Sequence, residues 1–158
     1  MINSLTENGM PFEPTYKTKR GIILMRRKEH LLYISGHGPE NQITGKPIYS
    51  GRIGKELNRE EGYLAARECG IIILGAVKDA LGSLDRIERI VKAFGMVNCD
   101  GDFQDLDGVM DGFSDLMTEV LEERGYHART VMGTHNLPNG NIPVEIETII
   151  AVRDCIWN

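Results

Sequence analysis

The sequence predicts an α+β fold, a single domain in which one mixed β-sheet carries two helices packed on one of its faces. Three observations favour this class. The chain has 158 residues, with 41% apolar and 26% charged residues, which suits one globular domain with a buried core. Two long segments place apolar residues at helical spacing. Shorter apolar runs, typical of strands, alternate with them in the order strand, strand, helix, strand, helix, strand, strand.

Charge and cysteine content limit the possible partners and compartment. The net charge of −5 gives no long-range attraction for nucleic acid or an anionic membrane, so neither partner is expected. No apolar run is long enough to cross a bilayer, and the N-terminus lacks a signal-peptide pattern. Cys69, Cys99 and Cys155 have no C-x-x-C spacing, which disfavours a disulfide framework or a zinc knuckle. We therefore expect a soluble cytoplasmic protein.

The N-terminal region is predicted to be an arm followed by a strand pair. Residues 1–20 are polar and contain two prolines, so we expect an arm without regular structure before a single domain over residues 21–158. Ile22–Met25 and Leu31–Ile34 are predicted strands, joined by a charged turn at residues 26–30.

The first helix follows a turn-rich segment, residues 36–54, which has many Gly, Pro and Asn residues. A loop this long in a compact domain often borders a functional site. Asn58 is expected to cap the helix, because Glu61 stands at capping-box spacing. The helix body is predicted over Arg59–Leu81, and Gly82 provides its C-terminal stop.

A strand and the second helix come next. Arg86–Asn98 reads as a strand in which apolar residues face both sides. Asp102 or Asp105 is expected to cap the helix after it, and Gly125 to end it. The helix has an acidic outward face and a regular apolar stripe made of Leu106, Val109, Met110, Phe113, Leu116, Met117, Val120 and Leu121.

A β-hairpin is the last predicted element. Its strands are His127–Gly133 and a return strand over Ile142–Glu147, which Ile149–Val152 extends. The turn is expected at Leu137–Gly140, because Asn-Gly between apolar runs is a strong hairpin signal. The hairpin is expected to bring one guanidinium and two carboxylates into an otherwise apolar sheet.

Two interpretations of this charge cluster remain open from the pattern. Arg129 shares a strand face with Val131 and either clamps a carboxylate or phosphate ligand or forms a cross-strand ion pair with Glu145 or Glu147. The ion pair is favoured on residue pattern alone. Glu145 and Glu147 share a face, so burial and mutual repulsion would raise the pKa of one of them, which could then activate water.

Other kinds of site are disfavoured. No two histidines have the i, i+4 spacing of metal ligands, no Ser-centred triad motif is present, and the glycine-rich segment lacks the interval of a phosphate-binding loop. We therefore expect no catalytic triad and no metal site. The predicted strands are apolar on both faces, but only two helices are available to cover them. We expect a second copy of the chain to cover the other face.

The motifs resemble those of the RidA/YjgF superfamily, also called the reactive intermediate deaminase or L-PSP endoribonuclease-like family. Y-I-S-G-H-G-P (Tyr33–Pro39) is similar to the family's strand-turn motif. A-R-T-V (Ala128–Val131), L-P (Leu137-Pro138) and V-E-I-E (Val144–Glu147) are similar to its C-terminal signature. The longer segment from Gly51 to Arg67 is typical of one divergent subgroup.

The resemblance implies a chorismate-mutase-like fold and a homotrimer with sites between its subunits. It also implies hydrolysis of an enamine or imine, a 2-imino acid giving a 2-keto acid and ammonia, without metal or organic cofactor. Arg129 would hold the carboxylate of a small-molecule substrate and Glu145 would orient water. Gly36, Val131 and Asp107 would line the substrate site.

Three positions depart from the family pattern: Ile22 stands in place of tyrosine, Asp107 in place of asparagine and Val131 in place of cysteine. The acidic Asp107 would discourage a second carboxylate nearby. A non-catalytic small-molecule binding trimer, in which Arg129 captures a carboxylate ligand, is the alternative function. The acidic balance and the lack of a basic groove weigh against endoribonuclease activity.

Overall fold

The structure is a computed structural model that describes residues 21–153. The predicted arm over residues 1–20 and Cys155 lie outside the described residues. Two short 3-10 turns, Leu84–Arg86 and Glu122–Gly125, precede β3 and β4. The other elements are β1 (Met25–Lys28), β2 (Leu31–His37), α2 (Arg59–Leu81), β3 (Ile87–Asn98), α3 (Leu106–Leu121), β4 (Ala128–Thr134), α4 (Pro138–Asn141) and β5 (Val144–Val152).

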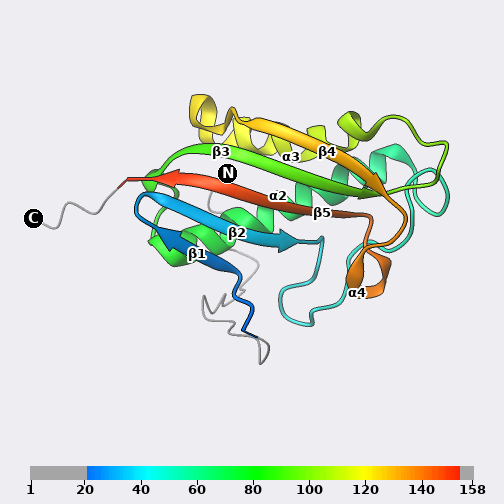
Figure 1. The fold of residues 1–158 in the computed structure, drawn as a ribbon, viewed down its shortest axis with the longest axis horizontal. Coiled ribbons are helices and arrows are strands. Elements are labelled where there is room, and N and C mark those ends of the chain that lie inside the picture. The colour runs from blue at the N-terminus through cyan, green and yellow to red at the C-terminus, as the bar shows by residue number, and fades with distance from the viewer. Residues whose placement is uncertain (1–20, 154–158) are drawn as a thin grey trace, which may run out of the picture.

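The strands form one mixed sheet in the order β1-β2-β5-β3-β4. β3 pairs with β4 in parallel and with β5 antiparallel, whereas β2 is antiparallel to both of its neighbours. Helices α2 and α3 lie together on one face of the sheet, behind it in Figure 1. The predicted α+β class, with two helices packed on one face of a mixed sheet, is confirmed.

The predicted hairpin between the last two strands is wrong, because β3 lies between them. Phe94 on β3 pairs with Thr130 of β4 on one side and with Glu147 of β5 on the other. The connection between β4 and β5 is held to the end of β3, where Asn98 donates a hydrogen bond through its backbone N–H to the Pro143 carbonyl at 2.8 Å. The connection therefore passes around β3 instead of reversing the chain beside it.

The Asn-Gly signal marks a real turn of a different kind. Asn139 and Gly140 have positive φ angles of 47° and 74°, inside the short α4 turn. The sequence signal identifies backbone that favours positive φ, but it does not identify which strands pair.

The first strand begins later than predicted. β1 covers Met25–Lys28, so its basic residues lie in the strand and only Glu29 and His30 form the turn. Ile23 and Leu24 accept hydrogen bonds from the Ser35 hydroxyl and backbone N–H, at 2.8 and 2.9 Å, but lie outside the regular ladder. Exposed charges are tolerated here because β1 is an edge strand.

The predicted caps at Asn58, Gly82 and Asp105 are confirmed, but α3 ends at Leu121, and the predicted stop at Gly125 instead ends the 3-10 turn that follows. The Asn58 side chain accepts a hydrogen bond from the Glu61 backbone N–H at 2.9 Å, and the Glu61 carboxylate accepts one from the Asn58 N–H at 2.7 Å. Gly82 ends α2 with a φ of 81°. Asp105 caps α3 by accepting from the Gly108 N–H at 3.1 Å. Neither helix, nor any other in residues 21–153, is long and apolar enough to span a bilayer.

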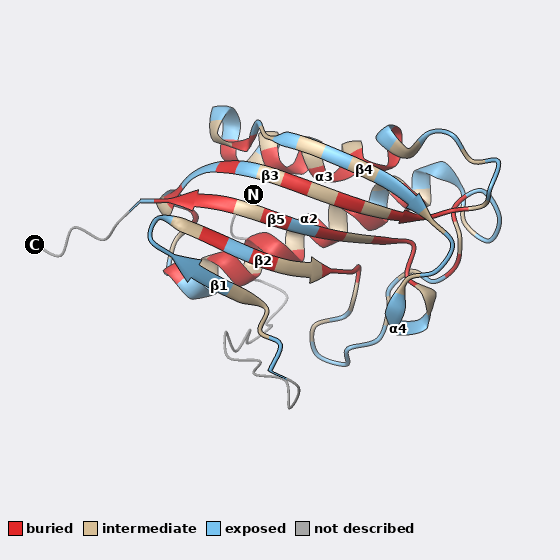
Figure 2. Ribbon diagram, in the orientation of Figure 1, coloured by how far each residue is buried: buried red, intermediate tan, exposed pale blue. Residues whose placement is uncertain are grey.

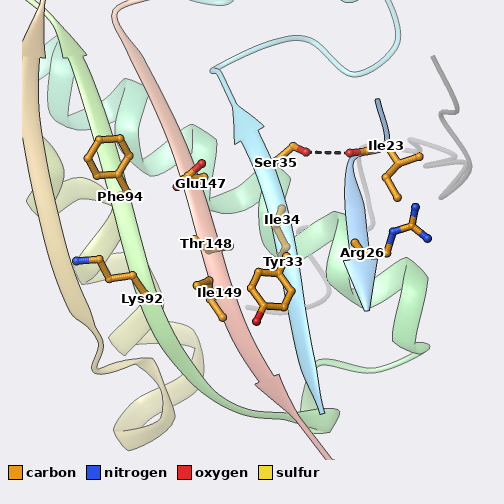
Figure 3. Close-up of a pocket in the computed structure, with 10 residues that line it drawn as sticks. All are labelled: Ile23, Arg26, Tyr33, Ile34, Ser35, Lys92, Phe94, Glu147, Thr148 and Ile149. Atoms are coloured by element: carbon orange, nitrogen blue, oxygen red, sulfur yellow. Dashed lines mark hydrogen bonds between the residues drawn. The ribbon is translucent and has the colours of Figure 1, made fainter. Parts of the chain in front are cut away.

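The two faces of the sheet differ sharply in burial, as Figure 2 shows for alternate residues along the strands. Leu32, Ile34, Val144 and Ile146 face the helices and are at most 4% exposed. The opposite face, which we call the open face, bears a cavity of about 500 Å³ lined by residues of β1, β2, β3 and β5. Figure 3 shows the side chains around it, among them Tyr33, Lys92, Phe94, Glu147 and Ile149. Coverage of this face by another copy stays a prediction.

Close contact between α2 and α3 depends on small residues. A Cβ added to Gly112 on α3 would lie 2.0 Å from the Tyr63 carbonyl oxygen on α2. In contrast, a Cβ added to Gly75 on α2 would have no heavy atom within 4 Å. The two positions therefore separate the cost of helix crowding from the intrinsic effect of replacing a helical glycine.

We predict opposite effects for alanine at these glycines. Gly112→Ala should lower the free energy of unfolding by about 1–3 kcal/mol, because the backbones must move apart. Gly75→Ala should raise it by about 0.5–1 kcal/mol, because alanine restricts the unfolded chain and favours helix. Urea unfolding measures both. A neutral or stabilising Gly112→Ala would contradict the described contact between the helices.

Candidate functional site

Arg129 lies on β4 and its side chain points to α3. It pairs across the ladder with Ala93, a core residue, which places both side chains on the helix-covered face. The guanidinium donates through Nη1 to Asp111 Oδ1 at 2.9 Å and to Ser114 Oγ at 3.1 Å. Its Nη2 donates to Asp107 Oδ1, also at 2.9 Å. The cross-strand ion pair expected from the pattern is therefore wrong, and the arginine is bound by helix α3.

Helical spacing explains how α3 surrounds this guanidinium. Asp107 and Asp111 are four residues apart and Ser114 is three further on, so all three project from one side of the helix. Asp107 was predicted at the site, but Asp111 and Ser114 were missed. The i, i+4 spacing of the two aspartates on α3 was a readable signal for an arginine on the strand that α3 packs against.

Ser114 also connects Arg129 to His127. The Ser114 Oγ lies 3.1 Å from His127 Nε2, and His127 Nδ1 lies 2.7 Å from the Gly125 carbonyl oxygen. Burial lowers the pKa of His127 and the Arg129 charge lowers it further, against the opposing hydrogen bond to Gly125. The neutral imidazole donates through Nδ1 to Gly125 and accepts the Ser114 hydroxyl at Nε2.

A groove of about 390 Å³ lies along this network. It runs beside the start of β4 and the middle of α3. Its size is within the range of small-molecule sites. Its lining residues are Ser114, Asp115, Thr118, Tyr126, His127 and Arg129.

Glu145 lies on the opposite face of the sheet. Its neighbours in β5, Val144 and Ile146, are fully buried beneath the helices, so the alternation of the strand directs Glu145 to the open face. Gly36 of β2 lies directly against it, since a Cβ there would be 2.1 Å from Glu145 Oε1. The β2–β5 register shifts between Ile34 and His37, at this same point. Glycine is therefore needed for the carboxylate to occupy its position.

The surroundings of Glu145 are acidic. Burial raises the pKa of the half-buried Glu145, and the negative charges of Glu40 and Glu147 raise it further. Glu40 comes from the turn-rich segment, and sequence reasoning missed it because no spacing links it to β5.

His37 is a second buried group beside Gly36. Its Nδ1 lies 2.7 Å from the Ser35 carbonyl oxygen, while Nε2 is buried without a hydrogen-bond partner among the described residues. Burial lowers the pKa of this imidazole. His37 and Glu40 also line a cavity of about 380 Å³ formed with the turn-rich segment.

The five predicted site residues thus fall into two groups. Arg129, Asp107 and Val131, which packs against the core, lie on the helix-covered side at the β4 edge. Glu145 and Gly36 lie on the open face, where β3 separates β5 from β4. We call these groups the arginine half and the glutamate half. One chain does not bring them into a single pocket. Ile22, at the third departing position, precedes β1 and is 56% exposed.

In the range 21–153, no three His, Cys, Asp or Glu side chains are grouped to hold a metal ion. Cys69 and Cys99 are buried free thiols, and burial raises the pKa of both.

Comparison with known proteins identifies the family. The family model described as "YjgF/chorismate mutase-like, putative endoribonuclease" matches residues 29–145. Protein TCP17 from Trypanosoma cruzi is 36% identical over 124 residues, covering 78% of this chain and 76% of that protein.

Solved structures agree in fold. The protein Atu1372 from Agrobacterium tumefaciens, of unknown function, is 32% identical with a TM-score of 0.82, covering 96% of this chain and 91% of that one. RidA from an Antarctic Psychrobacter is 21% identical with a TM-score of 0.59, covering 88% and 93%, and shares the fold. The chain therefore belongs to the RidA/YjgF family, as its motifs predicted.

Proposed function

We propose that the protein hydrolyses reactive enamines or imines derived from amino acids, at a site formed by the arginine half of one copy and the glutamate half of another. The observation that carries the proposal is Glu145. Its carboxylate is half-buried, fits against Gly36, and has a raised pKa. The raised pKa makes this carboxylate a stronger base than an ordinary glutamate. The family relationship supports the same class of reaction.

The proposed reaction needs no redox partner. Glu145 accepts a proton from water as the water oxygen bonds to the imine carbon, the C=N π electrons move to nitrogen, and the nitrogen takes that proton from the Glu145 carboxyl group. The hydroxyl group of the tetrahedral intermediate then gives up its proton, which passes by way of Glu145 to the amine nitrogen as the C–N bond breaks. The products are a C=O group and ammonia, and Glu145 is again ionised. The imine is already electrophilic, so positioning and charge complementarity supply the catalysis.

The arginine half would hold the substrate carboxylate. Three of the five N–H donors of Arg129 are used within the chain, by Asp107, Asp111 and Ser114. Two donors are not engaged by residues 21–153 and remain for a ligand. The contacts to α3 fix the guanidinium in one orientation, which reduces the ordering cost of binding.

A second copy is needed because the two halves face opposite sides of the sheet. The open face carries apolar side chains that the described chain leaves accessible, such as Tyr33 and Met132 at 45% and 47% exposure. A homotrimer, as the family resemblance implies, would cover them and place the glutamate half against a neighbour's β4 edge. The unbound edge of β4 is free in the described chain for such an approach.

We predict accelerated imine decay when an amino-acid oxidase generates imines in the presence of the protein. Semicarbazide traps free imine, so less semicarbazone should form. Glu145→Gln should reduce the acceleration about 100-fold or more, because the proton acceptor is lost. Arg129→Ala should reduce it as well. Glu147→Gln, with the same change on the same face of β5, is the matched control and should retain most activity at neutral pH.

Two results would count against this function. If the protein accelerates the decay of no imine, but Arg129 is still required to bind a carboxylate ligand, the function is that of a non-catalytic binding trimer. If acceleration survives Arg129→Ala, the arginine half is assigned wrongly.

We also predict a pH dependence set by Glu145. The carboxylate acts as base only when ionised, so kcat/KM should fall as pH drops through its raised pKa, above the range of an ordinary glutamate. Glu40→Gln removes a negative charge and should shift this acid limb to lower pH. Glu60→Gln, in the first turn of α2, is the control. An acid limb that does not move in Glu40→Gln would contradict the described electrostatics.

A further inference from the structure

We infer that the arginine half selects 2-imino acids whose side chain carries a positive charge. The inference rests on the proposed function and concerns the substrate class of the same site. It derives from the side chains gathered around Arg129, which combine a single cation with several carboxylates and an adjoining groove.

Charge around the guanidinium is the first observation. Asp107 and Asp111 each lie 2.9 Å from Arg129, so two carboxylates already oppose one positive charge. Asp115 adds a third carboxylate at the groove wall. When a substrate carboxylate binds Arg129, the net charge around the guanidinium becomes more negative still. The rest of the substrate is therefore best stabilised if it carries a positive charge.

The groove is the second, independent observation. Its volume of about 390 Å³ has room for a long side chain, and it begins at Arg129. Tyr126, 66% exposed, presents an aromatic ring there, and aromatic rings bind guanidinium and ammonium groups through cation–π contacts. Arg129 is the one arginine or lysine among the described residues that line it. His127 stays neutral because its pKa is lowered by burial.

Asp107 is the carboxylate beside Arg129 that can be replaced with little effect on packing. Its side chain is 77% exposed and its described contact is with Arg129, so the helix does not depend on it for packing. Asp107→Asn removes one negative charge and retains the shape. Glu119→Gln is the matched control: it removes one carboxylate from the same helix, but Glu119 pairs with Arg67 on α2, away from the site.

The test compares imines made in situ from arginine and citrulline, which are nearly equal in shape and differ by one charge. We expect kcat/KM for the arginine-derived imine to be about two- to fivefold higher, the size of one partly exposed ion pair. The glutamate-derived imine should be the poorest substrate. Asp107→Asn should bring the arginine-to-citrulline ratio towards one, while Glu119→Gln should leave it unchanged.

The possible results distinguish the substrate class from the proposed function. If the protein accelerates imine decay but has equal kcat/KM for the arginine- and citrulline-derived imines, the cationic substrate class is overturned and the deaminase function stands. The same holds if Asp107→Asn leaves the ratio of the two kcat/KM values unchanged. If no imine is accelerated, the proposed function itself fails. If Glu119→Gln changes the ratio as much as Asp107→Asn, the selectivity comes from overall charge and the assigned site is wrong.

Discussion

The placement of Arg129 and Glu145 depends on one constraint, the alternation of side chains between the two faces of a single sheet. Each strand directs consecutive residues to opposite faces, and helices fill only one of these faces. Arg129 falls on the helix-covered side and Glu145 on the open side, with β3 between their strands. No side-chain rotation brings them together within one chain. If the two residues act on one substrate, the second must come from another copy.

Each half of the proposed site is shaped by a different balance of forces. At Arg129, two aspartates and Ser114 hold the guanidinium in place, so its positive charge is constrained and partly neutralised. At Glu145, burial and the neighbouring acids Glu40 and Glu147 act in the same direction and raise the pKa. In the proposed reaction, the first arrangement would supply orientation and charge selectivity, and the second would supply a carboxylate that accepts a proton. The proposed chemistry is therefore the positioning of water on an electrophilic substrate, without a stronger nucleophile.

Local chemistry made much of the fold predictable. The capping box at Asn58, the stop at Gly82 and the stripe of α3 all rest on contacts within a few residues, and the structure confirms them. Strand pairing is non-local, so the Asn-Gly turn was assigned to a hairpin that β3 prevents. For the same reason the partner of Arg129 was wrongly expected on a neighbouring strand. Its actual partners are spaced along α3. The family motifs predicted Arg129 and Glu145 as site residues, but they did not predict that the two residues lie on opposite faces of the sheet.

Complementation between two inactive variants tests the central claim most directly. Arg129→Ala and Glu145→Gln should each lack imine hydrolysis, and co-assembled in equal amounts they should regain about a quarter of wild-type activity. That fraction follows because a quarter of the sites in a randomly mixed ring combine an intact arginine half with an intact glutamate half. Activity of the mixture no higher than that of either variant alone, with mixed assemblies verified by mass spectrometry, would contradict a site shared between copies.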